Sequence, residues 1–162
     1  MNNSEEQRFR RFFEEYSRMV YSVAFTMMKN SADSNDVMQD VFLKFYQNMD
    51  KLTDVAHIRP WLITVTMNTC RNNLRSGWFT RTIHREDYEE GSYEQDFGEK
   101  SELFYAVMEL PEKERIPIHL FYYEGCTTAE IAKLLNMKES TVRVRIMRGR
   151  EKLRKILKEE TV

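Results

Sequence analysis

The sequence has few of the residues that mark catalytic, metal-binding or disulfide-stabilised proteins. Its two cysteines, Cys70 and Cys126, have the spacing of neither a zinc site nor a disulfide framework. There is no glycine-rich phosphate loop, zinc-protease motif or nucleophile elbow. The three histidines, His57, His84 and His119, are scattered along the chain and suggest no acid–base or metal cluster. We therefore expect no catalytic residue, no metal and no cofactor.

Long apolar segments are also missing. The longest apolar runs span only a few residues, far fewer than the roughly 20 that cross a bilayer. The N-terminal segment MNNSEEQRFRRFF has no apolar stretch of the kind that a secretory signal requires. Hydrophobic residues still make up 41% of the chain, and charged residues make up 31%. This composition predicts a cytoplasmic protein without direct membrane insertion, folded as one large domain or two small ones.

The net charge of −1 hides an uneven distribution. Residues 59–85 contain five arginines and no acid, which gives +5. Residues 86–102 hold eight acids and one lysine, which gives −7. Residues 138–158 carry nine bases against two acids, which gives +7. Two basic segments separated by an acidic one indicate two anion-binding surfaces on separate domains.

The N-terminal part of the chain is predicted to form helices. Apolar residues recur mostly at three- and four-residue steps from Phe9 to Met27, as in an amphipathic helix. A second helix is expected to begin at Asp33 or Ser34, because both are good N-caps. Its predicted buried residues are Val37, Val41, Phe45 and Met49. A third helix is expected to begin at Pro60, since proline suits the first helical position.

The third segment has two interpretations. Residues 63–67 alternate apolar and polar side chains, as a half-buried strand does. We favour a helix, because one apolar stripe continues past the alternating stretch. That stripe consists of Ile63, Met67, Cys70 and Leu74. The opposite face then carries Trp61, Thr64, Asn68, Arg71, Asn72 and Arg75. Such groups can contact base edges or phosphates, and the absence of acids favours this role over a solvated face.

Residues 76–100 lack a helical apolar stripe and contain three glycines among many acids. Such a composition is typical of a tether and does not support a packed element. We therefore expect an all-α protein with two small helical domains, residues 1–76 and 101–162. Residues 77–100 would form an acidic, flexible linker between them.

The C-terminal domain contains the sequence signals of a helix-turn-helix. One helix is expected to end before Pro111, and the next is expected to end at Gly125, with a kink or restart at Pro117. The segment Thr127-Thr128-Ala129-Glu130 is a capping box, which starts a further helix. Asn136 suits the left-handed turn that follows, and a last helix is predicted over residues 139–157. Two helices joined by so short a turn predict a helix-turn-helix.

The last helix is predicted to have a buried face and an exposed basic face. The inner residues are Val142, Ile146, Gly149, Leu153 and Ile156. At roughly 100° per residue, the opposite side presents Ser140, Val144, Met147, Arg148, Glu151 and Lys155. The N-terminal part of the second helix of a helix-turn-helix enters the major groove. Packing of this charged helix on a partner protein is the alternative, which the capping box, the turn and the basic charge together disfavour.

Individual side chains of this face can be given predicted roles. Arg143 and Arg148 are candidates for guanine or phosphate contacts, and Val144 and Met147 can contact a thymine methyl group. The basic side chains further along the helix are expected to hold the DNA backbone, and they are Arg150, Lys152, Arg154 and Lys155.

Several stretches of the chain resemble sigma factors of bacterial RNA polymerase. Residues 36–46 resemble the region-two helix, and residues 59–75 look like the helix that reads the promoter. Residues 110–115, 130–135 and 140–153 resemble the region-four helix-turn-helix. The stretches occur in the family's order and cover most of the chain outside the predicted linker. Only regions two and four are present, which is similar to the extracytoplasmic-function group.

The resemblance implies a protein that binds core RNA polymerase and directs promoter-specific transcription initiation. Core-polymerase contacts, on the β′ clamp helices, are expected from Asp36, Gln39, Asp40, Phe42 and Leu43. Contacts with the minus-ten element are expected from Arg59, Trp61, Thr64, Asn68, Arg71, Asn72 and Arg75. Contacts with the minus-thirty-five element are expected from Ser140, Thr141, Arg143, Val144, Arg145, Met147 and Arg148.

The resemblance also implies further features. The loop over residues 52–60, with Asn68, resembles the part that captures a flipped minus-ten base. The β flap of the polymerase, promoter DNA and an anti-sigma protein are the other expected partners. The chain departs from the family pattern at Val144, where a small polar residue is common, at Lys138, which replaces a serine cap, and at Pro117.

A stand-alone helix-turn-helix regulator, with residues 1–75 as a sensor or dimerisation module, is the alternative function.

Overall fold

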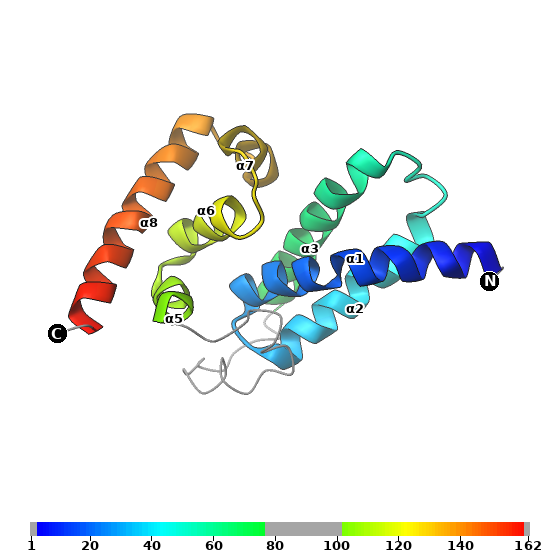
Figure 1. Ribbon diagram of the computed structural model, residues 1–162, viewed down its shortest axis with the longest axis horizontal. Coiled ribbons are helices and arrows are strands. Elements are labelled where there is room, and N and C mark those ends of the chain that lie inside the picture. Colours follow the sequence, from blue (N-terminus) through cyan, green and yellow to red (C-terminus); the bar gives the residue numbers. More distant parts are fainter. Residues whose placement is uncertain (1–2, 77–101, 161–162) are drawn as a thin grey trace. The chain divides into compact units, whose positions relative to one another are not determined.

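The computed structural model describes residues 3–76 and 102–160, and over these residues it contains helices and no strand (Figure 1). The chain divides into two compact units, Met1–Asp96 and Phe97–Val162. The boundary between the units falls outside the described residues, as does the predicted acidic linker, so the proposed domain limits stay predictions. In the part of the chain that is described, no helix is both long and apolar enough to cross a membrane.

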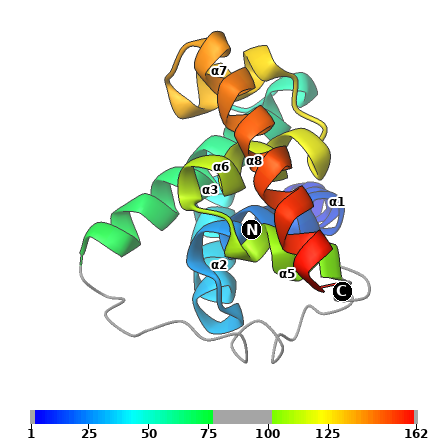
Figure 2. The ribbon, with the colours of Figure 1, turned by 90° about the vertical axis from the view of Figure 1, so that its left-hand side faces the viewer.

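Over the described residues 3–76, the N-terminal unit contains three long helices and one short one. They are α1 (Asn3–Met28), α2 (Ser31–Asn48), the 3-10 helix η1 (Val55–His57) and α3 (Ile58–Arg75). Each of the three long helices contacts the other two, and Figures 1 and 2 show α1 and α3 packed on α2. The predicted all-helical fold is therefore confirmed.

Aromatic side chains fill the core between α1 and α2. Phe12, Phe42 and Phe45 are buried. The Phe42 ring meets Phe13 edge to face with centroids 4.9 Å apart, and Phe45 meets Phe12 in the same way at 5.8 Å. Such aromatic pairs add to the free energy gained by apolar burial. The predicted inward residues of this segment are all buried, and they are Val37, Val41 and Phe45 in α2 and Met49 directly after it.

Asn30 caps α2, so the prediction of Asp33 or Ser34 as the cap is wrong. The Asn30 side chain accepts a hydrogen bond from the backbone N–H of Asp33 at 2.8 Å, and the Ser34 hydroxyl donates to the Asn30 carbonyl at 2.6 Å. Lys29 has a φ of 64°, which ends α1 and lets Asn30 take the extended conformation of a cap. Asp33 and Ser34 are buried within the first turns of α2.

The segment with two interpretations is helical. Thr66 is fully buried and Val65 is half-exposed, the reverse of what strand alternation requires. The predicted apolar stripe holds for Ile63, Met67 and Cys70 but is wrong for Leu74, which is 39% exposed. No residue from 71 to 76 is buried, because the last turn of α3 extends past the packed region.

α3 also begins earlier than predicted. Its first residue is Ile58, directly after η1, and Pro60 is its third residue. Proline is tolerated throughout the first helical turn because the N–H groups there have no partner within the helix. Ile58 is completely buried, so packing and not proline determines where the helix begins.

The C-terminal unit contains four described helices: α5 (Glu102–Glu109), α6 (Glu112–Tyr122), α7 (Thr128–Leu135) and α8 (Glu139–Glu160). α8 contacts α5, α6 and α7. Figures 1 and 2 show α7 beside the beginning of α8 and α5 beside its C-terminal half. The other three described helices of the unit thus all pack on the long helix α8.

The local sequence signals of the helix-turn-helix are confirmed. Thr127 and Glu130 form the reciprocal capping box at the start of α7. Asn136 has a φ of 52° and closes the turn before α8. α6 ends at Tyr122, before Gly125, which has a φ of 68°. Pro117 lies inside a single helix, so α6 does not restart there.

Gly149 allows α8 to approach α6 closely. A β-carbon at this position would lie 2.7 Å from Ile118 Cγ1, which is much closer than ordinary van der Waals contact. Val142 and Ile146 precede Gly149 on the same buried face, as the sequence predicted. α8 therefore packs closely against α6 at Gly149.

Substitution Gly149→Val is expected to destabilise the C-terminal unit by about 1–3 kcal/mol, because the new side chain collides with Ile118. Hydrogen–deuterium exchange should show faster exchange in α6 and α8 and unchanged exchange in α1 to α3. Glu151→Val is the control, since it places the same β-branched residue at an exposed position of α8. Equal exchange in the two variants would contradict the close packing.

Candidate polymerase and promoter interfaces

The exposed face of α2 carries most of the residues that were predicted to contact the polymerase. Asp36, Gln39 and Asp40 are exposed, and Leu43 is a 56% exposed apolar residue beside them. Asp40 Oδ2 lies 3.3 Å from Lys44 Nζ in an exposed ion pair. Of the predicted set, only Phe42 is inaccessible: its side chain is buried in the aromatic core. Phe42 can therefore support this face of α2 by packing in the core, but it cannot contact a partner directly.

The loop before α3 is held in place by α1. The Arg8 guanidinium donates hydrogen bonds to the carbonyls of Met49 at 3.0 Å and Leu52 at 2.6 Å. The Asp54 side chain then accepts from the backbone N–H of Ala56 at 3.0 Å, which caps η1. Val55, the first residue of η1, is 56% exposed. The loop is thus anchored at its base and presents its tip to solvent.

The predicted outer face of α3 is largely accessible. Thr64, Asn68, Asn72 and Arg75 are exposed, and Arg59, Trp61 and Arg71 are half-buried. Arg71 donates a hydrogen bond to Asn68 Oδ1 at 3.4 Å. The Trp61 ring lies 6.1 Å from the Phe45 ring, so one side of it belongs to the core. The described part of this face contains no acid.

The inner face of α3 is tied to α2 by packing and by one polar contact. Lys44 Nζ donates to Thr69 Oγ1 at 3.1 Å. Cys70 is fully buried, and its burial raises the pKa of the thiol to about 12, against a smaller lowering effect of Arg71. These contacts fix the rotation of α3 about its axis. They therefore determine which side chains face outward.

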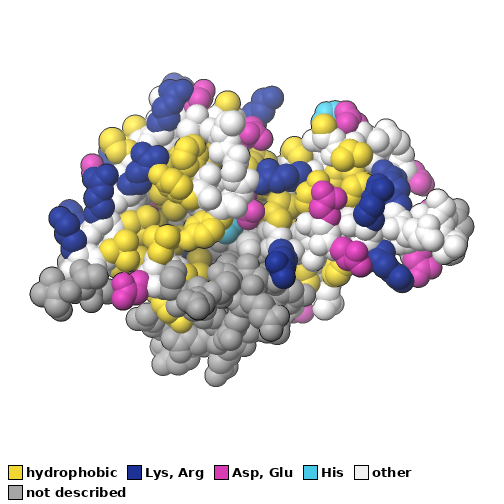
Figure 3. Space-filling model, in the orientation of Figure 1, with side chains coloured by type: hydrophobic (Ala, Val, Ile, Leu, Met, Phe, Trp, Pro, Cys, Tyr) yellow, Lys and Arg dark blue, Asp and Glu magenta, His cyan; other side chains and the backbone are white. Residues whose placement is uncertain are grey.

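All seven predicted minus-thirty-five residues are accessible on α8. Ser140, Arg143, Val144, Met147 and Arg148 are exposed, whereas Thr141 and Arg145 are half-buried. Met147 is 50% exposed and Val144 is 38% exposed, so both methyl-bearing side chains can reach a partner. Figure 3 shows Lys and Arg side chains along the edge of the C-terminal unit that α8 forms.

A cleft of about 320 Å³ lies between α6 and the N-terminal half of α8. Five of its lining residues belong to the predicted minus-thirty-five set, and they are Ser140, Thr141, Val144, Arg145 and Arg148. The other two, Lys113 and Glu114, come from the first turn of α6. Sequence reasoning gave neither residue a role. The motif Leu110-Pro-Glu-Lys-Glu-Arg was the only signal, and it pointed to region four as a whole.

Two basic side chains that were predicted to hold the DNA backbone, Arg150 and Lys152, contact α6. Lys152 Nζ lies 2.5 Å from Glu114 Oε1, a carboxylate that is almost completely buried. The Arg150 guanidinium lies over the Tyr122 and Phe121 rings, and its Nε donates to the Tyr122 hydroxyl. In this structure both side chains stabilise the packing of α8 on α6. Both side chains remain partly exposed, so their contacts with the DNA backbone stay a prediction.

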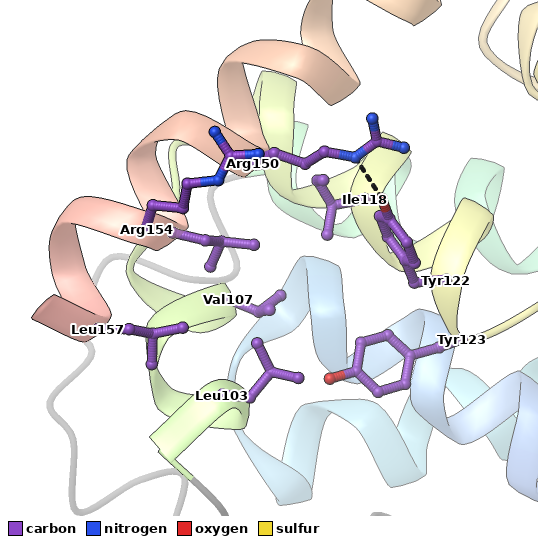
Figure 4. A pocket seen from close by; sticks show the side chains of 9 residues that line it. Leu103, Val107, Ile118, Tyr122, Tyr123, Arg150, Arg154 and Leu157 are labelled. Atoms are coloured by element: carbon purple, nitrogen blue, oxygen red, sulfur yellow. Dashed lines mark hydrogen bonds between the residues drawn. The ribbon is translucent and has the colours of Figure 1, made fainter.

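An apolar groove of about 460 Å³ opens on the other side of α8 (Figure 4). Its floor and walls come from α5, α6 and the C-terminal half of α8, and they are formed by Leu103, Val107, Ile118, Tyr122, Tyr123, Leu153 and Leu157. Arg150 and Arg154 also line it. Leu103, Tyr122 and Tyr123 are exposed. The sequence analysis did not predict this groove.

Within the described ranges, 3–76 and 102–160, no group of three or more histidine, cysteine or acidic side chains could hold a metal ion. Burial of Tyr123 raises the pKa of its hydroxyl, so the tyrosine on the groove stays protonated at neutral pH.

Two family models match the chain. The model of Sigma-70 region 2 matches residues 12–86, which include α2, η1 and α3. The model of Sigma-70, region 4 matches residues 101–153, which include α5, α6, α7 and most of α8. The two matches fall on the two compact units in the order that the sequence analysis expected.

Curated relatives identify the group. The ECF RNA polymerase sigma factor SigW of Bacillus subtilis (strain 168) is 27% identical over 160 residues, covering 89% of this chain and 86% of the relative. The ECF RNA polymerase sigma factor SigL of Mycobacterium tuberculosis (strain ATCC 25618 / H37Rv) is 28% identical over 158 residues, covering 93% and 89%. The chain belongs to the extracytoplasmic-function sigma factors.

A solved structure agrees on the fold. The sigma factor RpoE from Bartonella quintana, in complex with the anti-sigma factor NepR, has a TM-score of 0.72 and 19% identity, and the alignment covers 94% of this chain and 98% of that one. As a sigma factor, the protein binds core RNA polymerase and directs transcription initiation at promoters. Its region 2 contains the α2 and α3 faces, and its region 4 contains the cleft and the groove.

The sigma factor's Cys70 is expected to resist alkylation. Because its pKa is raised to about 12, the thiol stays protonated at pH 9. The rate of its reaction with iodoacetamide should therefore be lower in the native protein than in the urea-unfolded protein, by a factor of about 100 or more. Peptide mass spectrometry separates Cys70 from Cys126. Equally fast labelling in the two states would contradict the inward orientation of this face of α3.

Proposed function

We propose that the sigma factor contacts the minus-ten element through the outer face of α3 and the minus-thirty-five element through the outer face of α8. The observation that carries this proposal is the same in both units: a helix that is buried on one face presents basic side chains on the other, and on α3 the exposed amides of Asn68 and Asn72 lie beside them. Basic groups bind phosphates, and side chains on an exposed helix face can read base edges.

The minus-thirty-five contact is supported by the cleft beside α8. Arg145 and Arg148 line it together with Val144, so charged and methyl-bearing groups lie on the same surface. Arginine pairs with the O6 and N7 atoms of guanine, and apolar side chains contact the thymine methyl group. Lys113, at the start of α6, adds a further positive charge suited to a flanking phosphate.

The minus-ten contact is supported by the anchored loop and the outer face of α3. A base that leaves the stack needs a preformed pocket with amide or backbone partners. Arg8 holds the start of the loop in place, and Asp54 caps η1. Asn68 supplies an exposed amide on the following helix. Arg71 and Arg75 would hold the adjoining strand by its phosphates.

Polymerase binding is assigned to two further surfaces. The exposed face of α2, with Asp36, Gln39, Asp40 and Leu43, would dock on the β′ clamp helices. The apolar groove of region 4 would receive the β flap, because its exposed Leu103 and tyrosines fit an apolar partner. We also propose a cytoplasmic location, because promoter DNA and RNA polymerase are found there in bacteria.

An anti-sigma protein is proposed as a third partner. The Bartonella quintana RpoE structure contains the anti-sigma factor NepR, and the fold of that sigma factor is shared by this chain. An inhibitor that covered the α2 face or the region 4 groove would prevent polymerase binding.

Arg148→Ala is expected to reduce run-off transcription from a cognate promoter about tenfold, because one base or phosphate contact is lost. Binding to core polymerase should be unchanged in a pull-down. Arg10→Ala is the control, since it removes an equal charge from an exposed residue of α1. Wild-type transcription by Arg148→Ala would contradict the minus-thirty-five assignment.

Asp40→Lys is expected to weaken binding to core polymerase about tenfold, because it reverses a charge at the centre of the proposed docking face. Glu6→Lys is a matched control: Glu6 forms an exposed ion pair with Arg10, four residues later, at 3.3 Å, as Asp40 does with Lys44. A titration of labelled sigma factor with core polymerase measures both. Equal affinities of the two variants would remove the assignment of α2.

A further inference from the structure

One acidic side chain on the DNA-facing side of region 4 has a role that the sequence did not suggest. Glu139 is the first residue of α8. Its Oε1 atom accepts a hydrogen bond from the Thr128 hydroxyl at 2.7 Å and a second from Arg143 Nη2 at 2.7 Å. A single oxygen atom therefore links the start of α7 to an arginine of the recognition helix.

The position of Glu139 is unfavourable for DNA binding taken alone. A carboxylate beside the predicted DNA surface repels phosphates and lowers the overall electrostatic attraction. Its favourable interaction with the N-terminus of α8 and its exposed pair with Arg143, whose side chain is 62% exposed, contribute little stability. Stability is thus a weak explanation for an acid at this position.

Orientation is a stronger explanation. A free arginine side chain samples many rotamers, and contact with one base edge selects only a few of them. The Thr128 hydroxyl holds the Glu139 carboxylate against α7, so the carboxylate cannot simply follow the guanidinium. Arg143 is therefore restrained before DNA arrives, and preorganisation of this kind reduces the entropy lost on binding.

We infer that Glu139 is a positioning residue for promoter specificity: with Thr128 it holds Arg143 in the orientation that reads one base pair of the minus-thirty-five element. The inference rests on the proposed contact of Arg143 with that element. It adds two residues, Thr128 and Glu139, that need not touch the DNA themselves. Loss of the link should relax base choice without loss of overall binding.

The test is run-off transcription by the holoenzyme, assembled from the full sigma factor and core polymerase, on a promoter library randomised across the minus-thirty-five element. Arg143→Ala identifies the base pair that Arg143 reads. Glu139→Ala should reduce the preference at that same base pair by about fivefold or more, while total transcription from the library stays equal or rises. Glu139→Gln keeps an acceptor oxygen and should restore part of the preference.

Two controls separate positioning from stability and charge. Glu109→Ala removes an equal charge from an exposed residue of α5, away from the proposed DNA-binding face, and should leave base preference unchanged. In the Arg143→Ala background, Glu139→Ala should cause no further change in preference, because its effect acts through Arg143. A residue that only stabilised the fold would lower transcription from every promoter and would still act in that background.

The outcomes are distinguishable. Wild-type preference in Glu139→Ala, at a base pair that Arg143→Ala does change, would overturn the inference and leave the minus-thirty-five assignment intact. If Arg143→Ala changes no base preference, the inference fails together with the assignment of Arg143. A matching loss in Glu139→Ala and in Thr128→Val, at one base pair only, is the expected result.

Discussion

Burial of one face of α3 and one face of α8 is the constraint on which the proposed function depends. Ile63, Met67 and Cys70 are buried against α1 and α2, and Val142 and Ile146 are buried within region 4. Because a helix turns about 100° per residue, the buried residues determine the direction of every other side chain on it. The basic side chains of the opposite faces, and the amides of α3, are consequently directed outward.

α8 shows how one helix serves two kinds of partner. Its N-terminal half lines the cleft with α6, where arginines and methyl groups suit DNA. Its C-terminal half lines the apolar groove with α5 and α6, which suits a protein. The close approach at Gly149 and the Lys152–Glu114 pair hold α8 on α6 between the two surfaces. Displacement of α8 would therefore disturb both at once.

The sequence predicted the features that local periodicity and turn chemistry determine. The helical fold, the capping box of Thr127, the turn at Asn136 and the outward set of α8 all follow from spacing within one segment. Contacts between distant segments could not be predicted. Arg150 reaches Tyr122 across 28 residues, and Lys152 reaches Glu114 across 38, distances at which periodicity carries no information. The cleft and the groove escaped prediction for the same reason, since each exists only once separate helices are packed.

The most direct test of this account is run-off transcription with purified core polymerase on a promoter library randomised at both elements. The account predicts that the sigma factor confers start-site selection, with two separate blocks of preferred sequence upstream of each start, while the chain alone binds duplex promoter weakly. Selection of a single block, or tight duplex binding by a dimer of this chain without polymerase, would contradict it.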